Sequence, residues 1–128
     1  MIRVKLTSIM VNDQNRARAF YTEKLGFKIK HDLPCGEVAW LTLVAPDNLD
    51  GVELLLEPTG HPASKPFQQA LYADGMPLTQ LYSEDLWAEY ARLQAAGVTF
   101  KGEPKSMGPT LYADFDDTCG NIIRLLQG

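Results

Sequence analysis

The chain contains few of the side chains that bind transition metals or form disulfides. Its 128 residues include two cysteines and two histidines. Cys35 and Cys119 have neither zinc-type nor redox-type spacing, so we expect reduced thiols and a cytoplasmic protein. His31 and His61 lack the spacing of a histidine metal site, and we expect both to be solvated.

Long apolar runs and an excess of positive charge are also missing. No run approaches the roughly 18 apolar residues of a membrane span. Residues 1–4 lead directly into strand-like sequence, so we expect no signal peptide. The formal net charge of −4 disfavours nucleic-acid binding. We therefore expect neither a membrane nor a nucleic acid among the partners. The length fits a single domain with a buried core.

An eight-residue pattern, in contrast, occurs twice. Residues 6–13 and 78–85 both follow the order Leu-Thr-x-apolar-apolar-x-x-Asp, and a helical pattern ending in glycine comes after each. Such repetition indicates one supersecondary unit used twice. We expect repeat 1 over about 2–58, a connector over about 59–76 and repeat 2 over about 77–127.

The first half has the pattern of a strand, a helix and three further strands. Asp13 stands where a helix N-cap belongs, and the helical spacing of apolar residues extends to about Leu25. The four expected strands cover residues 2–11, 27–31, 37–45 and 52–57.

The second half repeats this order. Asp85 is the expected N-cap of a helix whose buried face contains Leu86, Tyr90 and Leu93. Residues 104–109 have the composition of a loop, and the connector allows one or two helical turns. The expected strands cover residues 77–82, 98–101, 110–115 and 121–126. The fold class is therefore α+β, with two tandem β-α-β-β-β units.

Three stretches make the chain resemble the vicinal oxygen chelate superfamily, which includes glyoxalase I, extradiol dioxygenases, and fosfomycin- and bleomycin-resistance proteins. Asp13 followed by Phe-Tyr-Thr-Glu-Lys-Leu-Gly-Phe at 20–27 resembles its D…FYxxxLGF signature. Residues 85–100 resemble the matching second-half helix, and Asp-Asp-Thr-Cys-Gly-Asn at 116–121 resembles its DPDGN closing hairpin. The resemblance implies two curled mixed sheets around a cleft between the halves.

In that family, the first and last strands of each unit hold a divalent metal. The resemblance places the four ligand positions at Leu6, Leu55, Leu78 and Arg124. Such a metal needs His, Cys, Asp or Glu donors, whereas leucine has no donor and arginine repels a cation. We therefore expect no metal and no cofactor.

Arg124 is the charged residue that the resemblance directs into the cleft. A guanidinium there is suited to a carboxylate or phosphate of a ligand. The alternative is an ion pair with Glu57, which lies two residues after Leu55 on the same strand face. The two interpretations are compatible, because an Arg–Glu pair can line a pocket.

Four further side chains are candidates for ligand contact. Trp40 is either a stacking surface or part of the core. Tyr112 either orients a ligand through its hydroxyl or reaches solvent. Ser8 and Gln80 each lie two residues after a first-strand metal position, Leu6 or Leu78, and share its strand face. They either add polar contacts to a ligand or only occupy space.

Three functions follow from these expectations. The favoured one is a metal-independent small-molecule-binding protein in the manner of bleomycin-resistance proteins. The second is a glyoxalase- or extradiol-dioxygenase-like enzyme with a non-standard metal site. The third is a metal-free enzyme in which Glu57 acts as acid or base and Arg124 holds an anion. The resemblance also implies a homodimer, with Trp87 as a candidate contact.

Overall fold

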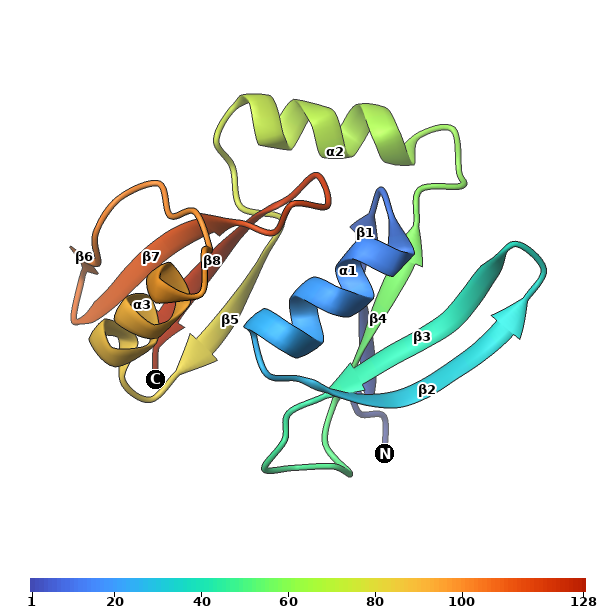
Figure 1. Cartoon of the computed structure of the whole chain (residues 1–128), viewed down its shortest axis with the longest axis horizontal. Coiled ribbons are helices and arrows are strands. Elements are labelled where there is room, and N and C mark those ends of the chain that lie inside the picture. Colours follow the sequence, from blue (N-terminus) through green and yellow to red (C-terminus); the bar gives the residue numbers. More distant parts are fainter. The chain divides into compact units, whose positions relative to one another are not determined.

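The computed structural model describes all 128 residues, which divide into two compact units, residues 1–65 and residues 66–128. Each unit contains a four-stranded mixed sheet in the order strand, helix, three strands, and in the second unit a further helix precedes this order (Figure 1). The α+β class and the tandem β-α-β-β-β arrangement predicted from the sequence are therefore confirmed. None of the helices has the length and hydropathy needed to span a bilayer.

The first unit is built on a sheet in which the first strand pairs with the last. Its strands have the spatial order β1-β4-β3-β2. β1 runs parallel to β4, and the other pairs are antiparallel. The strands are β1 (Leu6–Val11), β2 (Lys28–Cys35), β3 (Val38–Val44) and β4 (Glu53–Pro58). Between β1 and β2, helix α1 (Gln14–Ala19) continues into one turn of π-helix, η1 (Phe20–Lys24).

The second unit has the same strand arrangement, with β5 parallel to β8 in the order β5-β8-β7-β6. Its strands are β5 (Thr79–Ser83), β6 (Lys105–Met107), β7 (Thr110–Asp116) and β8 (Ile122–Gln127). Helix α3 (Leu86–Ala95) follows β5, and helix α2 (Ser64–Ala73) begins at the end of the first unit.

The repeated sequence pattern marks two equivalent helix starts. Asp13 and Asp85 both have extended backbone, with φ of −153° and −135°. Each carboxylate accepts a hydrogen bond from the amide three residues later, at 3.0 and 3.1 Å. These bonds satisfy amides that the first turn of a helix leaves without a partner. After the helices, Gly26 and Gly97 adopt the left-handed conformation that glycine tolerates.

Side chains of each sheet and of the helix packed on it form the core. In the first unit the buried set on the side of α1 is Ile9, Val11, Ala17, Phe20, Tyr21, Leu41, Leu43, Leu54 and Leu56. Thr42, Val44 and Leu55, on the other face of the same sheet, are also buried. In the second unit it includes Leu86, Leu93, Ala113, Phe115, Ile123 and Leu125. A chain of edge-to-face rings joins α3 to this second core, with centroids 5.9 Å apart for Trp87–Tyr90, 4.8 Å for Tyr90–Phe100 and 5.6 Å for Phe100–Phe115.

Helix α2 packs its polar side chains onto the turn between β7 and β8. Gln68 Nε2 donates to the carbonyl of Cys119 at 3.2 Å and to Asn121 Oδ1 at 3.0 Å, and all three residues are buried. The Asn121 side-chain amide in turn donates to Asp117 Oδ2 at 2.8 Å. Farther along the helix, Tyr72 donates to Asp116, and this hydrogen bond raises the pKa of the phenol above its ordinary value.

Several predicted boundaries were wrong. Strand β2 extends to Cys35, past the predicted end at residue 31, because its pairing with β3 continues to the turn at Gly36. β2 is an edge strand, so Pro34 is tolerated within it.

Further corrections concern the second half and the connector. Part of the predicted loop at 104–109 is β6, which forms a hairpin with β7 around Gly108. The predicted strand at 98–101 is limited to one bridge between Phe100 and Phe115. The connector helix has 10 residues, which exceeds the predicted one or two turns.

Candidate functional site

The register of the first sheet places three of the predicted ligand-contact residues, Ser8, Trp40 and Glu57, on one face. Ser8 on β1 and Thr42 on β3 are both paired with Leu55, and side chains alternate between faces along each strand. We call this the open face, because α1 contacts the sheet on its other side (Figure 1). Its members on β1, β3 and β4 are Leu6, Ser8, Met10, Val38, Trp40, Thr42, Val44, Glu53, Leu55 and Glu57.

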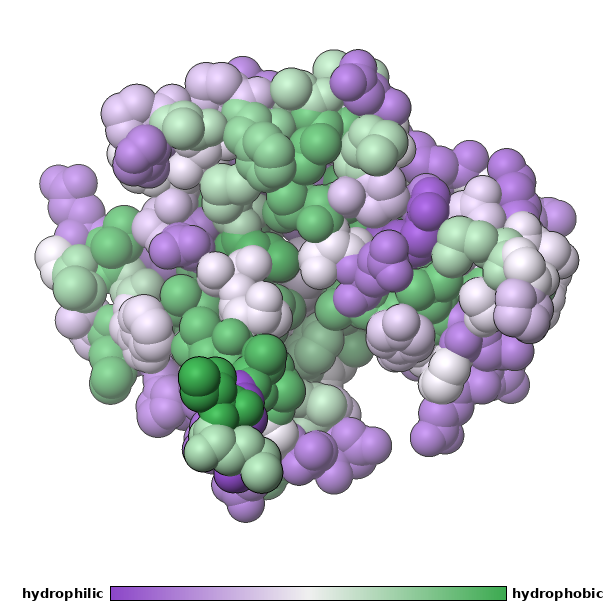
Figure 2. All heavy atoms as spheres, turned by 180° about the vertical axis from the view of Figure 1, so that it is seen from behind, coloured by the Kyte–Doolittle hydropathy of each residue, from purple (hydrophilic) through white to green (hydrophobic).

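The outer part of the open face exposes apolar side chains. Trp40 is 44% exposed, and Leu33, its partner on β2, is 56% exposed. Val38 and Leu6 are also exposed. Figure 2 views the molecule from behind and shows apolar residues reaching the surface among polar ones. A half-exposed indole beside aliphatic side chains provides a flat surface for a ring, although single exposed hydrophobic residues are common on proteins.

Beside these apolar residues lies a polar cluster that the sequence analysis missed. Thr42 Oγ1 donates to Glu53 Oε1 at 2.7 Å, and His31 Nε2 lies 3.7 Å from the same oxygen. His31 is paired with Thr42 across β2 and β3. The expected strand ended at His31, so the sequence offered no basis for placing this side chain in register with Thr42.

In the second unit, Arg124 is held by three neighbours. Its Nε and Nη2 donate to the two oxygens of Asp114 at 2.8 and 3.0 Å. Its guanidinium lies 4.3 Å from the ring centroid of Tyr112, and Nη1 lies 3.9 Å from Met107 Sδ. The hydrogen bond to Asp114 raises the pKa of Arg124, so the side chain stays charged.

This carboxylate partner differs from the one considered in the sequence analysis. Asp114 lies directly opposite Arg124 in the pairing of β7 with β8, whereas the sequence interpretation had considered Glu57. Gln80 is also paired with Arg124, through the parallel register of β5 and β8, and it is exposed. Arg124, Tyr112 and Gln80 therefore lie on one face of the second sheet.

The positions at which the family holds a metal do not have the chemistry to do so. Leu6 and Leu55 lie on the open face, Leu78 directly precedes β5, and Arg124 forms an ion pair with Asp114. Within either unit, no three His, Cys, Asp or Glu side chains lie where they could share a metal ion. The residues present therefore do not fit a divalent metal.

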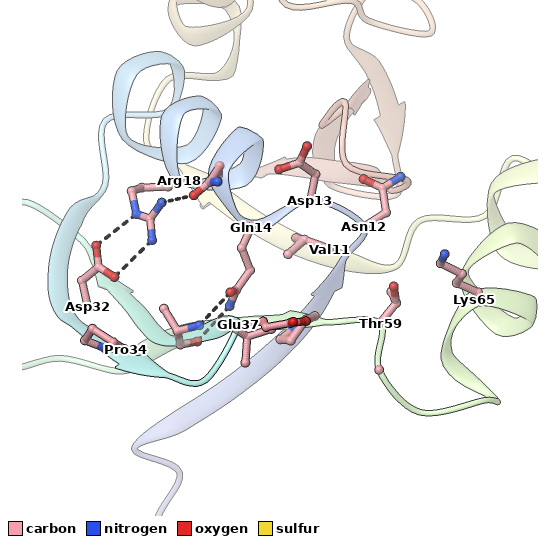
Figure 3. Close-up of a pocket in the computed structure, with 15 residues that line it drawn as sticks. Val11, Asn12, Asp13, Gln14, Arg18, Asp32, Pro34, Glu37, Thr59 and Lys65 are labelled. Carbon is pink, nitrogen blue, oxygen red and sulfur yellow. Dashed lines mark hydrogen bonds and ion pairs between the residues drawn. The ribbon is translucent and has the colours of Figure 1, made fainter.

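A separate hollow of about 540 Å³ lies in the first unit where α1 begins (Figure 3). Arg18 lines it and donates to both oxygens of Asp32, at 3.0 and 3.1 Å, and to Asn15 at 2.6 Å. Exposed Lys65 and Glu37 also contribute to the lining. None of the residues predicted to bind a ligand lines this hollow.

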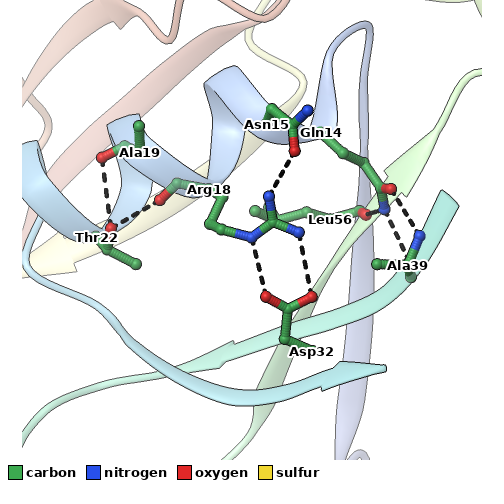
Figure 4. Close-up of polar contacts among 8 residues, drawn as sticks. All are labelled: Gln14, Asn15, Arg18, Ala19, Thr22, Asp32, Ala39 and Leu56. Carbon is green, nitrogen blue, oxygen red and sulfur yellow. Dashed lines mark hydrogen bonds and ion pairs between the residues drawn. The ribbon is translucent and has the colours of Figure 1, made fainter. Parts of the chain in front are cut away.

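Gln14, which lines this hollow, also forms hydrogen bonds to two strands of the sheet (Figure 4). β3 and β4 are paired only at Thr42–Leu55 and Leu43–Leu54. Beyond these pairs, the Gln14 amide accepts from the backbone N–H of Ala39 and donates to its carbonyl, both at 2.9 Å. It also donates to the carbonyl of Leu56 on β4 at 2.9 Å. The side chain thus replaces ladder hydrogen bonds where the strands separate, which is a structural role.

Two β-α-β-β-β units in tandem, each with its first strand parallel to its last, define the architecture of the vicinal oxygen chelate proteins. The family model of the Glyoxalase/Bleomycin resistance protein/Dioxygenase superfamily matches residues 3–125, and the chain belongs to this superfamily. The family resemblance noted in the sequence is therefore confirmed.

Three similar proteins illustrate the relationship. The uncharacterised protein YurT of Bacillus subtilis (strain 168) is 51% identical over 126 residues, covering 98% of this chain and 99% of YurT. The crystal structure of UcmS2 has a TM-score of 0.85 and 35% identity, covering 100% and 99% of the two chains. TnmS3, described as an antibiotic binding protein from Streptomyces sp. CB03234, has a TM-score of 0.77 and 31% identity, covering 99% and 96%.

Proposed function

We propose that this protein binds a small molecule without a metal and without chemical turnover, in the manner of bleomycin-resistance proteins. The observation that carries the proposal is that the family's four metal-binding positions lack metal ligands in this chain. Three of them are leucines, and the fourth is an arginine that is paired with Asp114. The similarity to TnmS3, described as antibiotic binding, supports a ligand of natural-product size.

The residues that we propose for ligand contact form one set in each unit. In the first unit they are Ser8, Trp40 and Glu57 on the open face. In the second unit they are Gln80, Tyr112 and Arg124. Trp40 supplies apolar contact area, and the polar residues supply hydrogen bonds that fix the orientation of the ligand. Small-molecule sites usually combine these two kinds of contact.

The enzymatic alternatives have less support. A glyoxalase- or dioxygenase-like reaction needs donors that the four family positions lack. A metal-free reaction through Glu57 needs a neighbour that tunes this carboxylate, but Glu57 is exposed and makes no ion pair. We also propose a cytoplasmic homodimer, supported by the dimerisation that is common in the family.

Two measurements test the binding function. We expect elemental mass spectrometry of protein purified without tag or chelator to find no stoichiometric metal. We then expect at least one member of a panel of aromatic antibiotics to raise the melting temperature equally with and without EDTA. Near-stoichiometric iron, manganese, nickel or zinc would contradict the proposal, as would conversion of the ligand in chromatographic analysis.

A matched pair of variants locates the ligand. Trp40→Ala should reduce the ligand-induced rise in melting temperature, because it removes the proposed stacking surface. Phe67→Ala removes an aromatic ring of similar exposure, 52% against 44%, from α2 and should preserve the rise. Equal effects of the two substitutions would show that Trp40 does not contact the ligand.

A further inference from the structure

The Glu53 carboxylate is fixed in position and still has an unused oxygen. Its Oε1 accepts from the buried Thr42 hydroxyl at 2.7 Å, which restricts the side chain to one orientation. Its Oε2 has no hydrogen-bond partner. The side chain of Glu53 is 24% exposed, so a ligand atom can reach it from the open face.

No arginine or lysine neutralises this carboxylate. His31 is the basic side chain beside it, at 3.7 Å, and is itself 44% exposed. Lys30 is paired with Asp50 instead. Lys28 shares the open face, in register with Val44, but lies two strands from Glu53, about 10 Å away by strand spacing. This contrasts with the second sheet, where Arg124 and Asp114 neutralise each other.

The carboxylate also lies close to the exposed apolar part of the open face. Trp40 and Thr42 are two residues apart on β3, so their side chains stand about 7 Å apart on the same face. Because Thr42 donates to Glu53, the carboxylate lies beside the residue that neighbours Trp40 on this face. A substituent that extends along β3 from a ring over Trp40 therefore approaches the carboxylate.

We propose that Glu53, held by Thr42, is the recognition point for a positively charged amine of the ligand, whose aromatic ring lies over Trp40. This inference rests on the proposed binding function and adds the chemical class of the ligand, an aromatic amine. A charged N–H donor to a carboxylate forms a shorter and stronger hydrogen bond than a neutral donor does. The net charge of −4 also favours a cation over an anion.

The test compares two probes of equal shape, naphthalen-2-ylmethanamine and naphthalen-2-ylmethanol. Their affinities for the full chain are measured by ¹H–¹⁵N NMR titration at neutral pH, where the primary amine of the first probe carries its positive charge. We expect the amine to bind about tenfold more tightly than the alcohol, with shifts centred on β3 and β4.

Variants assign this preference to one side chain. Glu53→Gln keeps an acceptor for Thr42 but removes the charge, and should give the two probes equal affinity. Thr42→Val should reduce the preference partly, because it releases the carboxylate from its fixed orientation. Glu23→Gln, which removes the same charge from an exposed position on η1, should leave the tenfold preference intact.

The outcomes separate this inference from the binding function. Equal affinity of both probes for the unmodified protein would overturn the role of Glu53 while leaving a binding site at Trp40. An amine preference that persists in Glu53→Gln would also overturn it. Failure of both probes to shift β3 and β4 would overturn the inference and count against the open face as a ligand site. The comparison on the unmodified protein remains decisive if a variant does not fold.

Discussion

Gly120 occupies a position in the β7–β8 turn that has no space for a side chain. Its φ is +94°, in the left-handed region that favours glycine. A Cβ at this position would lie 2.7 Å from Cδ of Gln68, whose amide is buried and bound to the same turn. Two independent features therefore exclude a side chain at Gly120, the left-handed backbone conformation and the close approach of Gln68 on α2.

We expect Gly120→Ala to lower the free energy of unfolding by about 2–3 kcal/mol, the sum of backbone strain and displacement of a buried, hydrogen-bonded side chain. Gly36→Ala is the matched control, because its φ is +69° and no atom lies within 4 Å of its Cβ position. The control should lose about 1 kcal/mol. Urea unfolding measures both values, and equal losses would show that Gln68 does not restrict Gly120.

Arg124 shows which residue-level contacts a sequence can predict. Its strand face could be predicted together with Gln80, because both lie at set distances from repeated motifs. Its partner Asp114 could not, since identifying it requires the alignment of β7 against β8. The same limit applies to Glu53 and Thr42, which meet across β3 and β4.

At the level of secondary-structure elements, the pairing of β3 with β4 is limited to two residue pairs. Beyond these pairs, the Gln14 side chain joins the two strands. Gln14 contributes one acceptor and two donors to backbone groups of Ala39 and Leu56. These groups belong to a partly buried region, where a missing partner costs about 1–3 kcal/mol. The first turn of α1 is therefore part of the hydrogen bonding of the sheet.

We expect Gln14→Leu to lower the free energy of unfolding by about 2–3 kcal/mol, because it preserves the side-chain size and leaves three backbone groups without their amide partner. Gln94→Leu on the exposed surface of α3 is the control and should change stability by less than about 0.5 kcal/mol. Chemical denaturation of the two variants provides the comparison. Similar stabilities would mean that solvent replaces the Gln14 amide without loss.

Helices were easier to predict from this sequence than short strands. The helix starts at Asp13 and Asp85 follow from local capping chemistry that is repeated in both halves. β6 has three residues, all exposed, so it lacks the alternation of buried and exposed side chains that reveals a strand. The length of β2 also escaped prediction, because all eight of its residues are exposed and Pro34 lies near its end.

At the scale of the whole molecule, the property to be tested is the oligomeric state of the native protein. Each chain has a mass of 14.2 kDa. The proposed homodimer predicts a particle of twice this mass in sedimentation equilibrium at micromolar concentration. A single species at the monomer mass over the concentration range would contradict it.

Trp87 provides a test of the proposed dimer contact. If α3 contributes to the contact, Trp87→Lys should shift the equilibrium toward monomer, because a charged side chain would replace an exposed indole. Ser106→Lys, on the exposed strand β6, adds the same single positive charge and should preserve the dimer. A dimer that survives Trp87→Lys unchanged would place its interface elsewhere.

The division into two units also gives the protein an internal optical label in each half. The chain has two tryptophans, Trp40 in the first unit and Trp87 in the second, and both are about half exposed. Replacing either one by phenylalanine leaves a single tryptophan, whose emission reports on one half alone when the excitation wavelength avoids the five tyrosines. The cooperativity between the two repeats thus becomes measurable as the difference between two fluorescence unfolding curves, without any attached dye.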